Sequence, residues 1–244
     1  MKKLVTVIVL SLCVLIGKAQ EVMVIEKSNG NDLRISVDEV KRVFFEQTTY
    51  HNGHEFVDLG LPSGIKWASC NVGASKPEEY GIYYAWGETT PKSSYSWDNY
   101  KWGDFWKNNI TKYNIDPSCG VVDNKVILEL TDDAANVNWG GKWRMPTLEE
   151  LTELITWSDI EETTLNGVAG FKFTSKRNSN YIFFPAGGWK TDSDTYHKGS
   201  AAWYRTSSLQ VAGNQMDSAY SLRNDEIDWG ERSWGMSVRP VFKE

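Results

Sequence analysis

Histidine and cysteine are scarce in this chain of 244 residues, which contains three of each. Nucleophilic catalysis usually needs a histidine or another base beside a serine or cysteine, and His51 and His54 stand in a polar, turn-rich segment. His197 lies near Asp192 and Asp194, but the surrounding sequence KTDSDTYHKG is typical of a polar loop. No cysteine or histidine spacing suits zinc. We therefore expect no enzyme, no cofactor and no metal site.

Basic residues are also in deficit, with 26 lysines and arginines against 32 acids, so the formal net charge is −6. An acidic surface argues against nucleic acid as the main partner. Carboxylates are plentiful instead, for example Asp225, Glu226 and Asp228. A glycosidase needs only two such groups and leaves little trace in a sequence, so this alternative stays open. We interpret these acids as solvated surface side chains.

Residues 1–19 have the pattern of a signal peptide. Two lysines precede the apolar run 4–16, and Gly17 and Ala19 supply small residues at a cleavage site. The run is short for a membrane span, and Cys13 lies inside it, which does not suit a lipoprotein signal. We predict cleavage after Ala19, no membrane span, and export to the cell surface, the extracellular space or the periplasm.

Removal of this segment leaves 23 basic and 32 acidic residues, so the net charge of the mature chain becomes −9. Two cysteines remain, Cys70 and Cys119. In an oxidising compartment they either form one disulfide, whose loop closure would contribute about 4 kcal/mol, or stay as two free thiols. The spacing alone favours neither alternative, because a bridge needs Cα atoms that lie close together.

Residues 20–48 predict a small β unit. Two short strands flank Asn29–Gly30, a strong hairpin-turn signal, and Ser36 to Glu39 form a capping box for one helical turn. A third strand is expected in 41–47. The polar segment 49–54 is the expected linker to the main domain.

The main domain, residues 55–244, predicts an α+β fold with many short strands, two helices and long loops. The segment 93–114 shows no clean periodicity, which indicates a structured loop. Short strands are expected on both sides of the turn 62–64, in 78–92, as a hairpin in 167–189, and in 201–208, 218–225 and 236–242.

The stretch NWGGKWRMPTLEELTEL, residues 138–154, predicts the start of an amphipathic helix. Thr147 is a good N-cap, and Glu150 completes a capping box three residues later. The apolar face of the helix comprises Leu148, Leu151, Leu154 and Ile155. We therefore interpret Trp139 to Thr147 as scaffolding that fixes this helix, rather than as a binding site.

A shorter helix is expected near Thr131. Asp132 and Asp133 would lie at its N-terminal end, where the helix dipole favours negative charge. The alternative is a calcium site, since carboxylates are the ligands that calcium prefers. The helix interpretation needs no metal and is preferred.

All twelve tryptophans lie between Trp67 and Trp234. Residues 95–106 hold six aromatics with Asp98, Asn99 and Asp104 between them, and residues 224–234 repeat this mixture on another expected loop. Aromatic faces stack on sugar rings while acids and amides bind hydroxyl groups. We predict that a ligand groove is lined by some or all of Trp97, Trp102, Trp106 and Trp229. Alternatively, these rings only pack the loops onto the sheet.

Five segments in order resemble the Fibrobacter succinogenes major paralogous domain, a family common in exported proteins of Bacteroidetes-type bacteria. They are FVDLGLPSGIKWASCNVGA, EEYGIYYAWGE, LTDDAANVNWGGKWRMPTLEEL, FPAGGW and SVRPV, and they span Glu55 to Val241. The WRMPT and RPV elements also resemble a group with a C-type-lectin-like fold, related to formylglycine-generating enzymes. The resemblance implies that the first and last strands of the domain pair and that long loops lie on one side.

The chain departs from these relatives in two places. The family usually has YWSSS where this chain has WYRTSS at Trp203 to Ser208. Formylglycine-generating activity uses a closely spaced cysteine pair near the C-terminus, and no cysteine follows Cys119. The resemblance therefore implies a fold rather than that chemistry.

Two functional hypotheses remain. One is a non-enzymatic binding module for glycan or another surface ligand, such as a cell-surface protein. The other is a structural or adhesive subunit of a cell-surface assembly, which would show an apolar patch or strand edge for a partner. Exposure of the loop tryptophans discriminates between them.

Overall fold

The computed structural model describes residues 22–25, 33–39, 49–214 and 216–244. The chain separates into two compact units, Met1–Gln47 and Thr48–Glu244. The expected signal peptide, the Asn29–Gly30 turn and the expected third strand lie outside the described residues.

The first unit contains a β-hairpin ladder. Strands β1 (Val22–Ile25) and β2 (Leu33–Ser36) pair antiparallel, with Val22 opposite Ser36. A 3₁₀ turn, η1 (Val37–Glu39), follows at the expected capping box. The described apolar side chains of this unit are largely exposed, among them Val22, Val24 and Leu33.

The second unit has a mixed α+β fold, mostly strands with two short helices, as the sequence predicts. The helices are α1 (Ala134–Trp139) and α2 (Leu148–Thr156). The strands are β3 (Thr49–His51), β4 (His54–Val57), β5 (Lys66–Ala68), β6 (Tyr83–Tyr84), β7 (Ser158–Leu165), β8 (Val168–Ser175), β9 (Tyr181–Pro185), β10 (Trp189–Thr191), β11 (Asp194–Tyr196), β12 (Trp203–Leu209), β13 (Ser218–Arg223), β14 (Glu226–Glu231), β15 (Gly235–Ser237) and β16 (Val241–Phe242). Four further 3₁₀ turns are η2 (Trp97–Asn99), η3 (Phe105–Lys107), η4 (Leu130–Asp132) and η5 (Ala212–Asn214).

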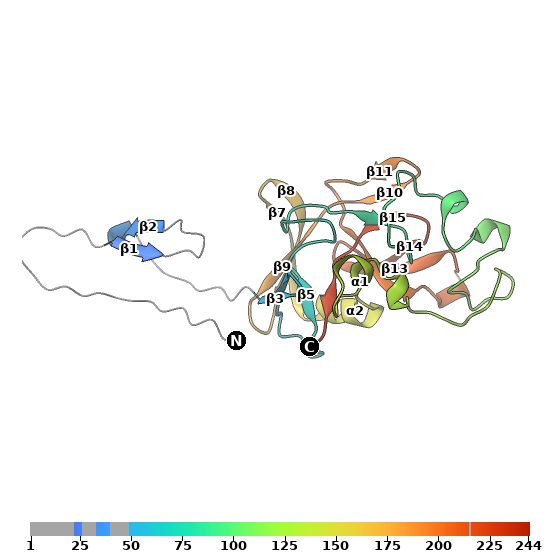
Figure 1. The fold of residues 1–244 in the computed structure, drawn as a ribbon, viewed down its shortest axis with the longest axis horizontal. Coiled ribbons are helices and arrows are strands. Elements are labelled where there is room, and N and C mark those ends of the chain that lie inside the picture. Colours follow the sequence, from blue (N-terminus) through green and yellow to red (C-terminus); the bar gives the residue numbers. More distant parts are fainter. Residues whose placement is uncertain (1–21, 26–32, 40–48, 215) are drawn as a thin grey trace, which may run out of the picture. The chain divides into compact units, whose positions relative to one another are not determined.

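These strands form three sheets, shown in Figure 1. The largest has the order β11-β10-β15-β12-β13-β14, with β6 also pairing β15. A second has the order β16-β5-β4-β3, so the last strand pairs with one of the first, Val241 lying opposite Trp67. The third is the antiparallel set β7-β8-β9. The long segment between β6 and α1 carries η2 and η3, and in Figure 1 it lies at the opposite end of the unit from β7 and β8.

The corner before α2 forms as the sequence predicts. Thr147 and Glu150 make the capping box, and Leu151 and Leu154 are buried. Trp143 is fully buried, and its indole nitrogen donates to the His51 carbonyl oxygen at 2.9 Å. Arg144 makes two side-chain hydrogen bonds to the Glu150 carboxylate. Trp143 and Arg144 therefore have structural partners, and Arg144 also joins β16 through a β-bridge with Val241.

Residues 49–54 form a hairpin of the second unit rather than a linker. Strands β3 and β4 pair across Asn52–Gly53, whose φ values of 47° and 82° suit a two-residue turn. The hairpin is held by ring stacking: His51 lies 4.2 Å from Phe242 and His54 lies 3.7 Å from Trp139, centroid to centroid. The polar composition concealed β3, because the ring that stacks on its His51, Phe242, comes from a distant part of the chain.

The segment 224–234 is also not a loop. It contains β14, which pairs with β13 in the register Tyr220 opposite Trp229. Strands β7, β10 and β11 were likewise not predicted. These are polar strands with mostly exposed or half-buried side chains, so the apolar alternation that marks a strand is weak in them.

The core of the second unit consists of two large clusters of buried residues. One surrounds Trp86, Trp143 and Phe242, and the other surrounds Trp67, Leu154 and Phe184. Cys119 is buried in the first cluster, and both Cys70 and Cys119 are free thiols. Within the described part of the chain, no helix is long and apolar enough to cross a membrane.

Candidate functional site

The segment 97–107 is built from two short 3₁₀ turns, η2 and η3. Asp104 caps η3 by accepting a hydrogen bond from the Trp106 backbone nitrogen at 2.9 Å. Asn108 ends the turn in the left-handed region, with φ 53°. Because the chain reverses within so few residues, Trp97 and Phe105 are brought within 6.2 Å of each other, centroid to centroid.

This segment and β14 together form a surface that we call the aromatic patch, comprising Trp97, Phe105, Trp106, Trp229 and Glu231. Trp106 packs edge-on against Phe105 at 5.1 Å, and Phe105 contacts Trp97. The Trp97 indole nitrogen donates to Glu231 Oε2 at 2.8 Å. Trp229 lies two residues before Glu231 on β14, so both project to the same face of that strand.

Exposure separates the members of the patch. Trp106 is 67% exposed and Trp229 is 45% exposed, whereas Trp97 and Phe105 are half-buried. The inner rings pack against the core, with Tyr100 under Trp97 at 5.2 Å. The patch thus has two outer rings available for a ligand and two inner rings that support them.

Trp102 does not belong to this surface. Its indole nitrogen donates to the Gly87 carbonyl oxygen at 2.9 Å, and its ring packs edge-on against Tyr113. The ammonium groups of Lys101 and Lys112 lie 4.2 and 4.9 Å from its ring centroid. Trp97 and Trp106 are thus joined through Phe105, and Trp229 shares one face of β14 with Glu231, whereas Trp102 packs against Tyr113.

Charged groups border the patch. Lys107 Nζ lies 2.9 Å from Asp98 Oδ1 and 2.8 Å from Asp104 Oδ2. The hydrogen bonds that Lys107 donates to Asp104 and Asp98 raise the pKa of Lys107, so its ammonium stays protonated at neutral pH. Asp98 and Lys107 are exposed, and they place an acceptor and a donor beside Trp106.

Two buried arginines hold the backbone under the patch. Arg205 donates to the carbonyl oxygens of Gly230, Glu231 and Trp234. Arg232 ties the preceding loop to the same region by donating to the Tyr100 hydroxyl and to the carbonyl oxygens of Lys112, Tyr113 and Met216. Because these hydrogen bonds hold the backbone in one conformation, they preorganise the surface and reduce the conformational entropy that is lost on binding.

No protein-family model, curated protein or solved structure matches this chain.

Sequence reasoning missed two members of the patch, Phe105 and Glu231. Glu231 was detectable in principle, because the alternation in 226–231 after the turn at Asn224 predicts a strand with Trp229 and Glu231 on one face. Phe105 was counted among the aromatics of its segment but not assigned a role. The contact between Trp97 and Glu231 joins residues 134 positions apart, and nothing local to either segment indicates it.

Asp132 and Asp133 are both engaged by protein donors. Asp133 is the N-cap of α1 and accepts from the backbone nitrogens of Ala135 and Asn136, so it lies at the N-terminal end of a short helix as predicted. Asp132 accepts from Lys101, Lys112 and Tyr113. Among the described residues there is no group of three or more histidine, cysteine or acidic side chains that could hold a metal ion.

The three histidines are used in ring packing. His51 and His54 stack in the hairpin described above, and His197 stacks on Trp189 at 4.8 Å.

The aromatic patch itself offers stacking surface, hydrogen-bond acceptors and one ammonium group, which suits recognition of a polar ligand with an apolar face.

Proposed function

We propose that the second unit is a C-type-lectin-like, non-enzymatic module of an exported protein that binds glycan through the aromatic patch. The observation that carries this proposal is the exposure of Trp106 and Trp229, together with the hydrogen bond that joins the Trp97 segment to Glu231 on β14. A contiguous patch of exposed aromatic rings rimmed by polar groups is typical of an interaction surface. Sugar rings present C–H faces to aromatic rings and hydroxyl groups to carboxylates and amines, and Asp98 and Lys107 supply both polar types.

The assignment of the fold class is supported by two features. The terminal strand β16 pairs with β5 in the sheet that also holds the first strands, β3 and β4, which is close to the pairing of first and last strands that the family resemblance implies. The segment between β6 and α1 is long and has little regular structure beyond short 3₁₀ turns. Loops of that kind, held on a rigid scaffold, are where binding residues usually lie.

The test is glycan-array binding by the full chain and by a double variant, Trp106→Ala with Trp229→Ala. We expect the variant to lose array binding while its melting temperature stays within about 3 °C of the parent, since both rings are largely exposed. Trp157→Ala is the matched control, because Trp157 is an exposed tryptophan outside the patch. Equal binding by the parent and the double variant would remove the patch from the proposal.

A structural or adhesive subunit is the second candidate. It is favoured by the exposed apolar side chains of the first unit, Val22, Val24, Leu33 and Val37, because a small β unit with such a surface gains stability when a partner covers it. Analytical ultracentrifugation of the full chain tests this candidate. Self-association that is lost in a Val22→Thr, Val24→Thr variant, together with a blank glycan array, would make it the better conclusion.

A further inference from the structure

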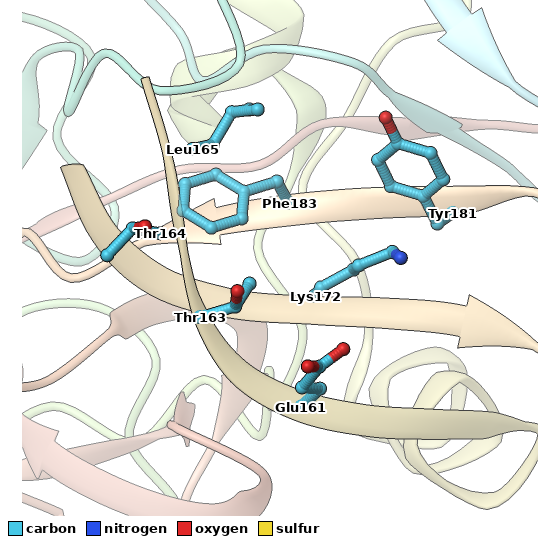
Figure 2. Close-up of a pocket in the computed structure, with 7 residues that line it drawn as sticks. All are labelled: Glu161, Thr163, Thr164, Leu165, Lys172, Tyr181 and Phe183. Carbon is cyan, nitrogen blue, oxygen red and sulfur yellow. The ribbon is translucent and has the colours of Figure 1, made fainter. Parts of the chain in front are cut away.

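The three-stranded sheet β7-β8-β9 carries a hollow of about 360 Å³ on its outer face, shown in Figure 2. This volume lies at the small end of the range for ligand sites. The hollow is far from the aromatic patch. In Figure 1, β7 and β8 lie at the opposite end of the second unit from the segment that carries η2 and η3. Its lining residues are Glu161, Thr163, Thr164, Leu165, Lys172, Tyr181 and Phe183.

The floor of the hollow depends on Gly170. In the register of the sheet, Gly170 lies between Thr163 on β7 and Pro185 on β9. A Cβ at Gly170 would lie 2.5 Å from Phe183 Cζ, so the Phe183 ring fills the space that a side chain would take. Phe183 alternates with the core residue Phe184, yet it is only 3% exposed. The Phe183 ring therefore lies low over Gly170 and forms the floor of the hollow, and the other lining side chains rise around it.

The walls are polar and come from one row across the sheet. Glu161 lies opposite Lys172, and Lys172 lies opposite Phe183. The ammonium group of Lys172 lies 4.8 Å from the ring centroid of Tyr181, which is 50% exposed. Among the described residues no ion pair within 4.0 Å joins Glu161 to Lys172, so both groups stay available for hydrogen bonds to a ligand. Figure 2 shows these side chains standing around the same space, with Thr163 completing the β7 side.

The chemistry of this lining favours an uncharged ligand with several hydroxyl groups. One carboxylate and one ammonium cancel in charge, so neither an anion nor a cation is preferred, and the acidic chain as a whole disfavours anions. Glu161 accepts hydrogen bonds, Lys172 donates them, and the hydroxyl groups of Thr163 and Tyr181 do both. Adjacent hydroxyl groups of one sugar ring need this mixture of acceptors and donors, and the half-exposed Tyr181 offers it an aromatic side.

We infer that this hollow is a second saccharide site, which takes one neutral sugar unit through Glu161, Lys172 and Tyr181. The inference stands on the hollow alone and does not require the aromatic patch to bind. If both sites bind, two sites at opposite ends of one unit engage two glycan chains, and binding to a glycan-coated surface gains from effective concentration.

The test is a ¹⁵N nuclear magnetic resonance titration of the full chain with three probes, the methyl glycosides of glucose, galactose and mannose. We expect at least one to shift the amide signals of Thr163, Lys172 and Tyr181 in a saturable manner. Glu161→Gln and Lys172→Met should each weaken that binding about tenfold, as loss of a charged hydrogen-bond partner does. Glu162→Gln is the matched control, because the neighbouring residue on β7 projects to the opposite face.

Two results would overturn the inference. One is the absence of saturable shifts at the hollow with all three glycosides. The other is that a zwitterionic dipeptide such as alanyl-leucine shifts these signals while the glycosides do not, which would make the hollow a peptide site. The double variant Trp106→Ala, Trp229→Ala separates this test from the first proposal, since its shifts at the hollow should equal those of the parent chain.

Discussion

Three arginines of the second unit are buried without a carboxylate partner among the described residues. Arg205, Arg232 and Arg239 are each at most 1% exposed, and their side chains donate mainly to backbone carbonyl oxygens. Burial lowers the pKa of Arg205 and Arg239, but the guanidinium group stays protonated in proteins. Its fixed fork of donors can hold several carbonyl groups at once, which no other side chain does. The three arginines therefore link distant loops through hydrogen bonds to their backbone.

The first prediction follows for Arg232, which binds one hydroxyl and three carbonyl oxygens. Arg232→Lys keeps the charge but cannot reach these acceptors together, so buried acceptors lose their donor. We expect a loss of about 2 to 4 kcal/mol in the free energy of unfolding, measured by urea denaturation. The control is Arg223→Lys on the surface, where a change of less than about 0.5 kcal/mol is expected. Equal effects of the two substitutions would contradict the role of the buried fork.

The second prediction concerns pH. Burial raises the pKa of Asp133 to about 6, although its three backbone hydrogen bonds act in the opposite direction. The folded state therefore favours the protonated form, so this contribution to stability is complete below pH 4 and is lost as the pH rises through about 6. The shift from 3.8 corresponds to about 3 kcal/mol. Relative to Asp133→Asn, the parent chain should gain stability as the pH falls from 7 to 4.

Neighbouring groups define the control for that experiment. Burial alone would raise the pKa of Asp132, but hydrogen bonds from Lys112, Tyr113 and Lys101 outweigh it and lower the pKa. Its contribution has the opposite sign: it is present at neutral pH and is lost as the pH falls below about 4. Burial also lowers the pKa of His54, which costs stability as the pH falls below 6.5. Because His54 is common to the parent and both Asp variants, difference curves of the melting temperature cancel its effect. Curves of the same sign for Asp132→Asn and Asp133→Asn would contradict the assignment.

At the scale of elements, a helix or hairpin could be predicted where its own residues carry the signal, such as a capping box or a turn. The capping box of Thr147 and Glu150 and the hairpin of β8 and β9 were both predicted. Strands β3 and β14 were not, although each adjoins a turn signal. The sequence of β14 does alternate but was assigned to a loop, whereas the residues of β3 are polar and gain their packing partners from other parts of the chain, for example Phe242 for His51. A strand that is stabilised by such contacts leaves little periodicity in its own sequence.

The third prediction tests the corner before α2. The fully buried Trp143 is surrounded by the rings of His51, Trp139 and Phe242. Trp143→Ala removes these contacts and leaves the His51 carbonyl oxygen without its donor, so we expect a loss of about 3 to 5 kcal/mol in unfolding free energy. Thermal melting should show a drop of roughly 10 °C. Trp157→Ala serves as the control, with little change expected. An unchanged melting temperature for Trp143→Ala, combined with lost ligand binding, would make the corner a binding site after all.

At the scale of the whole molecule, the candidate site was only partly predictable. Trp106 and Trp229 are exposed in the structure, and their assignment to a ligand groove stays a prediction. The assignment of Trp102 to the same surface was not confirmed, since its ring is covered by two lysines. Trp97 is held at β14 by its hydrogen bond to the Glu231 carboxylate, and Arg205 holds the backbone of Glu231 in place. These depend on how distant segments pack and on no local pattern.

The last prediction concerns where the second unit begins. The sequence placed its boundary at Glu55, after a linker, whereas the structure includes the β3–β4 hairpin from Thr49. Two shortened chains, one starting at Thr48 and one at Glu55, separate these alternatives. The shorter chain lacks the His51 carbonyl that accepts from Trp143 and the Asn52 amide that donates to the Trp139 carbonyl oxygen at 2.5 Å.

Loss of the hairpin also exposes Phe242 and Trp139, on which His51 and His54 stack. An unsatisfied buried donor and the lost packing together cost about 2 to 4 kcal/mol, so the chain starting at Glu55 should melt roughly 5 to 10 °C below the chain starting at Thr48. Circular dichroism melts of both chains at the same protein concentration measure this difference. If the two melting temperatures coincide, residues 48–54 behave as a linker, and the contacts of His51 and His54 contribute nothing to the stability of the fold.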